Sequence, residues 1–198
     1  MPVANLWREL PPGPDVPQVI YAVVEIPKRC RNKYEYDEQG GFIKLDRVLY
    51  SSLHYPGDYG FIPRTLDDDG DPLDVLVMTN EPTFSGCVIE ARPLGVFHLP
   101  DRGVQDDKIF AVPHTDPLFA DYRSLEDVPP HFLHEVQHFF SVYKDLEQAE
   151  VKAGGGMDWN RLMRRSSAAW KRTPGCCAHV LPTLPSICNV GGRAGERG

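Results

Sequence analysis

The feature that most constrains this chain is the acidic stretch 67–74, which reads Asp-Asp-Asp-Gly-Asp-Pro-Leu-Asp. Its five carboxylates fall within eight residues, directly before the apolar run 75–78. Carboxylates crowded this closely repel one another, so a fold that keeps them together needs a compensating cation. Gly70 permits the tight turn that such a pocket requires. A solvated acidic turn explains the cluster alone equally well. If a cation site forms, three carboxylates are expected to meet there: Asp69, Asp71 and Asp74.

The composition is that of a soluble globular protein large enough for one domain and an appendage. Its charge is unevenly distributed. Residues 1–150 carry 13 basic and 26 acidic side chains, whereas residues 151–198 carry 8 basic and 2 acidic ones. An acidic body argues against nucleic acid or an anionic membrane as the main partner. No apolar run approaches membrane-spanning length.

The N-terminus and the cysteines indicate a cytoplasmic protein. No basic start followed by an apolar stretch marks a secretory signal. The five cysteines form no Cys-x-x-Cys pair, which disfavours zinc and favours reduced thiols.

Short strand-like runs separated by turn residues dominate the first part of the chain. Apolar, β-branched runs predict strands at 19–26, 73–78, 87–97 and 109–113, and a hairpin is expected to turn at 39–41. Many short strands with few helices predict a mainly β fold with flanking helices (α+β), built on a closed or partly closed barrel.

Two further segments are expected to differ from this pattern. Residues 54–64 contain two tyrosines four apart around Pro-Gly and are expected to form a rigid irregular loop. A helix is expected at about 130–143, because its apolar side chains follow helical spacing: Phe132, Val136, Phe139, Phe140 and Tyr143. His134 and His138 lie four apart, but no Glu completes a His-Glu-x-x-His pattern, so a solvated helix face is favoured over a metal site.

Several charged residues outside the acidic stretch have simple explanations when each is taken alone. Alternation along a strand puts Lys33 and Glu35 on the same side, where a surface ion pair with Arg47 would explain them. From its position alone, Glu25 reads as an outward-facing strand residue. A second acidic group at 101–107 also adjoins an apolar strand, which makes two acidic loops harder to dismiss than one.

Together these residues predict metal-assisted phosphoryl hydrolysis without identifying the substrate. Oxygen ligands suit magnesium, manganese or calcium, and phosphate is the natural companion of magnesium. The sequence contains no Ser-His-Asp arrangement, no cysteine nucleophile with a partner histidine and no glycine-rich phosphate loop. Two rival classes remain: an OB-type module that binds nucleic acid, which the acidic body disfavours, and a structural protein whose carboxylates only hold calcium or magnesium.

Residues 5 to about 152 closely resemble the soluble family I inorganic pyrophosphatases. The resemblance rests on motifs that occur in order: Tyr-Ala-Val-Val-Glu-Ile-Pro, Lys-Tyr-Glu, Asp-Arg-Val-Leu, His-Tyr-Pro-Gly-Asp-Tyr-Gly, Asp-Gly-Asp-Pro-Leu-Asp-Val-Leu-Val, Asp-Asp-Lys-Ile and Phe-Phe-x-x-Tyr-Lys-Asp-Leu-Glu. A lone Asp-Gly-Asp would be weak, but the ordered set is highly specific.

The resemblance implies a five-stranded OB-like closed barrel with one or two helices packed outside, and hydrolysis of diphosphate to two phosphates. It implies several Mg²⁺ ions, with Mn²⁺ or other divalent ions as alternatives. Asp71 matches the general base, which would deprotonate a water held between two metals to give a metal-bridged hydroxide, the nucleophile. The implied metal residues are Asp69, Asp74, Asp101 and Asp106 as direct ligands, and Glu25 and Glu35 mainly through water. The implied phosphate ligands are Lys33, Arg47, Tyr59, Lys108, Tyr143 and Lys144, with Tyr59 also counted as catalytic and Tyr55 supporting its loop.

The chain departs from the family pattern at two places. Arg102 stands where many relatives carry Glu, which exchanges an anion for a cation and leaves metal binding near Asp101 open. Residues 153–198 replace an expected amphipathic helix with an Arg-, Cys- and Pro-rich tail, which we expect to be partly helical or disordered and a possible frameshift product. The resemblance also implies a homo-oligomer, with a hexamer favoured over a dimer.

Overall fold

The computed structural model describes residues 5–67, 70–101 and 104–147, with the side chains of 99–101 and 104–106 also left undescribed. The predictions for Asp69, for Arg102 and for the tail therefore lie outside the described residues. So do those for the side chains of Asp101 and Asp106.

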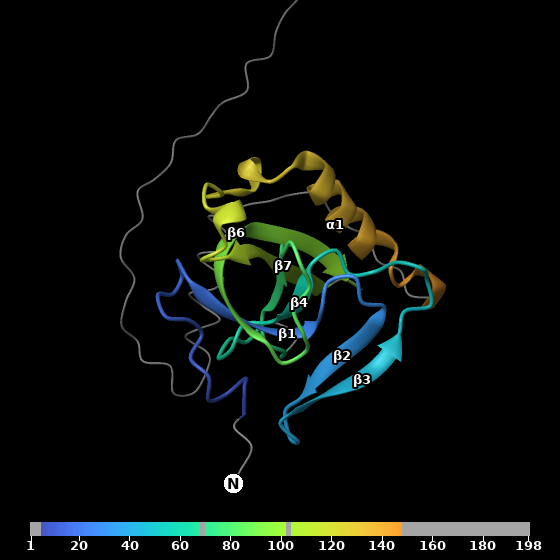
Figure 1. Cartoon of the computed structure of the whole chain (residues 1–198). Helices are drawn as coiled ribbons and strands as arrows, with labels where there is room; N and C mark the ends of the chain where they lie inside the picture. Colours follow the sequence, from blue (N-terminus) through green and yellow to red (C-terminus); the bar gives the residue numbers. More distant parts are fainter. Residues whose placement is uncertain (1–4, 68–69, 102–103, 148–198) are drawn as a thin grey trace, which may run out of the picture.

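Five strands close into a barrel in the order β1-β4-β5-β7-β6 (Figure 1). They are β1 (Ile20–Ile26), β4 (Asp58–Phe61), β5 (Asp74–Val77), β6 (Val88–Asp101) and β7 (Val104–Pro113). The β5–β7 pair is parallel and the other neighbours are antiparallel. The predicted five-stranded closed barrel is confirmed.

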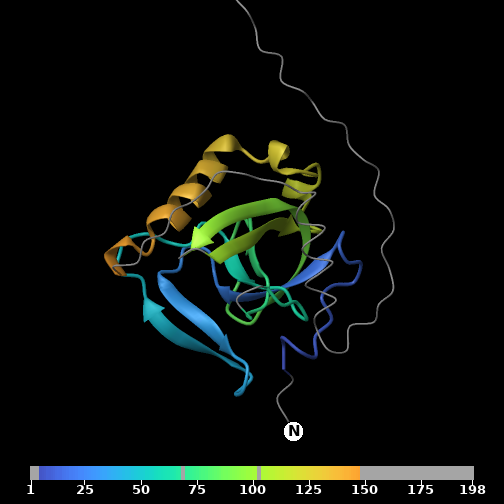
Figure 2. The same ribbon diagram turned by 180° about the vertical axis from the view of Figure 1, so that it is seen from behind.

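The predicted hairpin forms a separate two-stranded sheet beside the barrel, made of β2 (Asn32–Asp37) and β3 (Phe42–Val48). Both views show it projecting from the barrel as its own layer (Figures 1 and 2). Lys33 lies opposite Arg47, and a register shift follows directly, so that Tyr34 lies opposite Leu45. The irregularity sits among the charged residues at the base of the hairpin.

The expectation of an irregular loop over 54–64 is wrong for its centre, because residues 58–61 form strand β4 and are buried throughout. A side chain at Gly60 would place its Cβ 1.8 Å from the carbonyl oxygen of Val23 on β1. Only glycine permits this close approach of β4 to β1. The glycines that suggested a loop instead allow a tightly packed strand.

Helix α1 (Pro130–Val142) confirms the predicted helix and covers one side of the barrel (Figures 1 and 2). Its buried stripe contains Val136, Phe139 and Phe140, while His134 and His138 are exposed as expected of a solvated face. Short 3₁₀ helices precede and follow it: η1 (Pro117–Phe119), η2 (Leu125–Asp127) and η3 (Asp145–Glu147). In the part of the chain that is described, no helix is long and apolar enough to cross a membrane.

Strand alternation divides the core into an inner and an outer cluster. Val75 and Ile109 belong to a cluster drawn from β1, β5, β6 and β7, which fills the barrel. Leu76 and Phe110 point the other way and pack with the buried side of α1. Phe110 contacts two aromatic rings, with centroids 5.8 Å from Phe97 and 6.1 Å from Phe132.

Substitution Phe110→Ala should lower the free energy of unfolding by about 3–5 kcal/mol, because it removes a fully buried ring between the barrel and α1. Phe84→Ala is the matched control, since Phe84 is 67% exposed, and its effect should stay within about 0.5 kcal/mol. Urea denaturation measures both changes. Equal losses in the two variants would contradict this division of the core.

Candidate active site

A cavity of about 270 Å³ lies between the β2–β3 hairpin and barrel strands β1, β4 and β5. It gathers six of the predicted site residues from separate parts of the chain: Glu25, Lys33, Glu35, Tyr59, Asp71 and Asp74. The chain thus brings carboxylates and a cation to one cavity at the junction of the two sheets.

The acidic stretch reaches the cavity through a tight turn that leads directly into β5. The backbone N–H of Asp67 donates to the carbonyl of Asp71 at 2.7 Å, and Gly70 has a positive φ of 97°. That conformation is the one for which glycine is suited, as the sequence predicted. Asp71 and Asp74 line the cavity, whereas Asp67 is not among its lining residues.

Lys108 delivers a buried cation beside Asp74. The two residues are register partners in the parallel β5–β7 pair, and the Lys108 Nζ forms a short ion pair with the Asp74 carboxylate. Lys108 is only 4% exposed and its Nζ lies 5.8 Å from the ring centroid of Tyr59. A charge this deeply buried needs such a partner, so the pair explains how the lysine is tolerated.

The hairpin contributes its own charged group at its base. Lys33 and Glu35 lie on the same side, as predicted, and form a short ion pair, while Asp46 lies 3.7 Å from the Lys33 Nζ. Arg47 pairs with Asp46 and Glu147, whereas the sequence had suggested a surface ion pair between Arg47 and the group formed by Lys33 and Glu35. Burial acts to lower the pKa of Arg47, but the hydrogen bond and charge of Glu147 and the charge of Asp46 raise it.

Glu25 is the residue whose position alone was most misleading. The outward-facing interpretation is wrong, because its side chain lines the cavity and its Oε1 accepts the backbone N–H of Tyr36 at 2.7 Å. Burial raises the pKa of Glu25 to about 8, and the nearby charges of Asp74 and Glu35 act in the same direction. A carboxylate in this environment is favoured in its charged form only when a cation joins it.

The remaining predicted phosphate ligands lie at the end of α1 and do not line this cavity. Tyr143 is buried and stacks on Phe139 at 5.1 Å, and the Lys144 Nζ lies 5.3 Å from the Tyr143 ring centroid. Tyr55 is 2% exposed, and burial raises the pKa of its hydroxyl well above its usual value. Its ring contacts Tyr59 at 5.4 Å, which supports its predicted role of holding the tyrosine loop.

Two residues of this region were missed by reading the sequence. Asp46 and Glu147 form ion pairs with Arg47, yet neither was singled out as a site residue. Asp46 is adjacent to Arg47 in the sequence, so their closeness in space could have been predicted. Glu147 lies 100 residues away, and no local pattern signals that contact.

The donor set fits a hard divalent cation. Among the side chains that the structure describes, which exclude those of Asp101 and Asp106, no three from His, Cys, Asp or Glu stand close enough to hold a metal by themselves. Even so, Glu25, Glu35, Asp71 and Asp74 all line one cavity. Magnesium keeps several waters and needs only one or two protein carboxylates with phosphate oxygens, so this loosely spaced set suits it.

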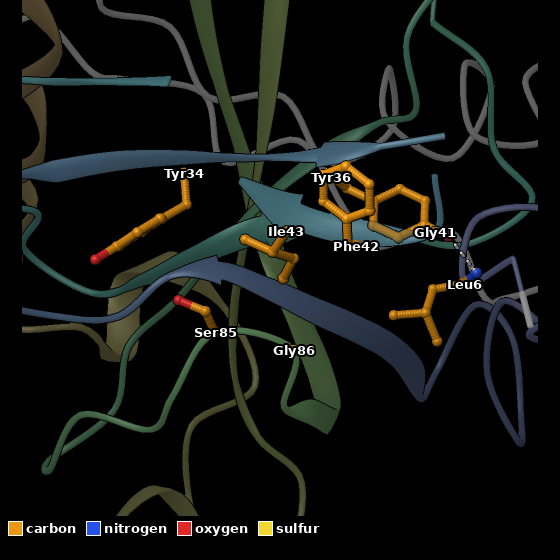
Figure 3. Close-up of a pocket in the computed structure, with 8 residues that line it drawn as sticks. All are labelled: Leu6, Tyr34, Tyr36, Gly41, Phe42, Ile43, Ser85 and Gly86. Carbon is orange, nitrogen blue, oxygen red and sulfur yellow. Dashed lines mark hydrogen bonds between the residues drawn. The ribbon is translucent and has the colours of Figure 1, made fainter. Parts of the chain in front are cut away.

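A second, larger cavity of about 530 Å³ lies between the hairpin and the residues Leu6, Ser85 and Gly86 (Figure 3). Tyr34 and Tyr36 reach it, and the backbone N–H of Leu6 donates to the Tyr36 hydroxyl at 2.8 Å. No charged side chain lines it. Its lining therefore offers no charged side chain to a metal ion or a phosphate.

A family model described as inorganic pyrophosphatase matches residues 22–169. The chain belongs to the inorganic pyrophosphatase family. It is accordingly an enzyme of this class, and the resemblance read from the ordered motifs is confirmed. The family match continues past residue 152, where the motif resemblance ended.

Curated pyrophosphatases from distant organisms share about half of their residues with this chain. That of Haloferax volcanii is 51% identical over 157 residues, covering 79% of this chain and 89% of the relative. That of Halalkalibacterium halodurans is 53% identical over 142 residues, covering 72% and 87%. The crystal structure of inorganic pyrophosphatase from Thermus thermophilus matches with a TM-score of 0.81 at 42% identity, covering 85% of this chain and 98% of that one.

The pKa of Glu25 predicts a pH-dependent stability in magnesium-free protein. The folded state retains the Glu25 proton up to about pH 8, whereas the unfolded chain releases it near pH 4.5. The folded state therefore binds more protons between these values, and its free energy of unfolding should fall as pH rises, by at most about 1.4 kcal/mol per pH unit.

Urea denaturation at several pH values between 5 and 8, in the presence of a chelator, measures this slope. Glu25→Gln should flatten it, while Glu126→Gln, which changes an exposed residue on η2, should leave it unchanged. The same slope in wild type and Glu25→Gln would show that another group is responsible.

Proposed function

We propose that this chain splits inorganic diphosphate into two phosphates with Asp71 as the general base and magnesium as the cofactor. The observation that carries the proposal is the single cavity that joins Asp71 and Asp74 to Lys33, Glu25 and Tyr59. Family membership supplies the substrate class. Water attacks one phosphorus, the Asp71 carboxylate accepts its proton, and the bridging P–O bond breaks to release phosphate.

The metal residues proposed are those implied by the motifs: Asp69, Asp74, Asp101, Asp106, Glu25 and Glu35. Magnesium, or manganese in its place, would neutralise phosphate charge and lower the pKa of the attacking water. Asp71 would be left to receive the proton, since its turn presents the carboxylate at the exposed edge of the cavity. Arg102 adds a positive charge beside Asp101, which we propose weakens cation binding at that position.

The proposed phosphate ligands are Lys33, Arg47, Tyr59, Lys108, Tyr143 and Lys144. Three of these cations already face carboxylates: Lys33 with Glu35, Lys108 with Asp74 and Arg47 with Glu147. When substrate and cation enter together, carboxylates can transfer to the cation and lysines to phosphate oxygens without any charge being left uncompensated. Arg47 can bind phosphate through two nitrogens, whereas a lysine acts as a point charge.

We also propose a location, an oligomeric state and a domain boundary for the protein. Cys30 and Cys87 are free thiols, which supports a cytoplasmic location. Exposed apolar side chains such as Phe42 and Leu45 on the hairpin support a homo-oligomer, with a hexamer favoured over a dimer, which light scattering tests.

We propose residues 1–152 as the catalytic domain and 153–198 as the product of a frameshift. An intact mass of 22.3 kDa from natural material would contradict the frameshift.

Asp71→Asn should reduce magnesium-dependent phosphate release from diphosphate by about 10²–10⁴-fold, because the amide cannot accept the proton of water. The matched control is Asp121→Asn, an exposed position outside the cavity, which should retain activity. Undiminished phosphate release by Asp71→Asn would show that Asp71 is not the general base. Absence of any magnesium-dependent release in the unmodified chain would overturn the enzyme itself.

A further inference from the structure

Glu147 holds Arg47 by two contacts at once. Its Oε1 accepts from the Arg47 Nε at 3.1 Å, and its Oε2 lies 3.0 Å from Nη2. The Glu147 side chain is 13% exposed and that of Arg47 is 29% exposed. A two-point contact between a carboxylate and a planar guanidinium fixes the plane of the guanidinium as well as its position.

The contact leaves the outer edge of Arg47 available for another anion. Glu147 takes the Nε–Nη2 edge, and Asp46 accepts from Nη1. Nη1 and Nη2 each carry two hydrogens, so one on each remains for a further acceptor. Arg47 can therefore bind a phosphate without releasing Glu147.

The contact also joins two parts of the proposed site that are otherwise separate. Arg47 lies on β3 opposite Lys33, while Glu147 lies on η3, where its backbone N–H donates to the carbonyl of Lys144 at 2.9 Å. In both views the η3 segment that follows α1 lies beside the end of β3 (Figures 1 and 2). One ion pair thus sets the hairpin cations relative to the segment that carries Tyr143 and Lys144.

We propose that Glu147 is a positioning residue for substrate binding. It orients the Arg47 guanidinium toward a phosphate of diphosphate and anchors the hairpin to the end of α1. The inference rests on the proposed role of Arg47 as a phosphate ligand. Glu147 touches neither substrate nor metal in this role. The opposite role would make Glu147 an internal anion that competes with phosphate for Arg47, and the two roles predict effects of opposite sign.

The test uses the full-length protein with magnesium and the non-hydrolysable analogue imidodiphosphate, whose binding is measured by titration calorimetry. Glu147→Gln should weaken analogue binding by about tenfold, since the amide keeps the shape but cannot accept from both nitrogens. KM for diphosphate should rise by a similar factor, while kcat should change less than KM. Glu135→Gln makes the same change at an exposed position of α1 and should leave binding and activity unchanged.

A double-mutant cycle shows whether Glu147 acts through Arg47. Arg47→Ala should weaken analogue binding more than Glu147→Gln does, and adding Glu147→Gln to Arg47→Ala should cause no further loss. Glu147→Asp keeps the charge but is one methylene too short for both contacts, so it should weaken binding by an intermediate factor. If circular dichroism shows that Glu147→Gln does not fold, Glu147→Asp takes its place in the test.

Each other outcome overturns a specific statement. Tighter or unchanged analogue binding by Glu147→Gln, or a further loss in the double variant, overturns the positioning role while the role of Arg47 stands. Unchanged binding by Arg47→Ala overturns the proposed phosphate ligand itself, and the inference with it.

Discussion

The site depends on one constraint: charges that leave water together must compensate one another. Lys108 is almost fully buried and can remain charged there because Asp74 faces it across the β5–β7 pair. Lys33 with Glu35 follows the same rule at the base of the hairpin. These pairs allow the protein to fold with these charges out of water, and they bring both signs of charge to the place where we propose that diphosphate and magnesium bind.

The parallel pairing of β5 and β7 is the element of the fold that makes this possible. It puts Asp74 level with Lys108 at the start of β5, immediately after the turn that presents Asp71. Farther along the same strands, Val75 and Ile109 fill the barrel, and Leu76 and Phe110 pack toward α1. Alternation along two strands therefore supplies the core, while their common edge supplies the site.

Periodicity, turn residues and motif order were sufficient to predict the barrel, the hairpin and α1. The barrel strands and α1 bury regular apolar patterns, and the turn residues 39–41 mark the hairpin. Strand β4 was not predicted, because the tyrosines and glycines of residues 54–64 resemble a loop. The structure shows instead that Gly60 lets the strand pack closely against the carbonyl of Val23. Glu25 was named only through the family motif. Its position in the strand was misleading, because strand alternation indicates a side but not whether that side faces water or a cavity covered by the hairpin. Glu147 escaped because its contact with Arg47 spans 100 residues and leaves no local signal.

The hairpin explains why such remote contacts matter. A two-stranded sheet alone is marginally stable in water, so its position depends on what it docks against. At one end Tyr36 accepts from the backbone of Leu6, and at the other Arg47 pairs with Glu147. Two of the proposed phosphate ligands, Lys33 and Arg47, are carried by this sheet, while Lys108 is carried by the barrel. A phosphate held by both groups would tie the hairpin to the barrel, so the free energy of substrate binding includes that of docking the hairpin. Contacts that dock it beforehand reduce the ordering that binding must otherwise supply, and strengthen substrate affinity without touching the substrate.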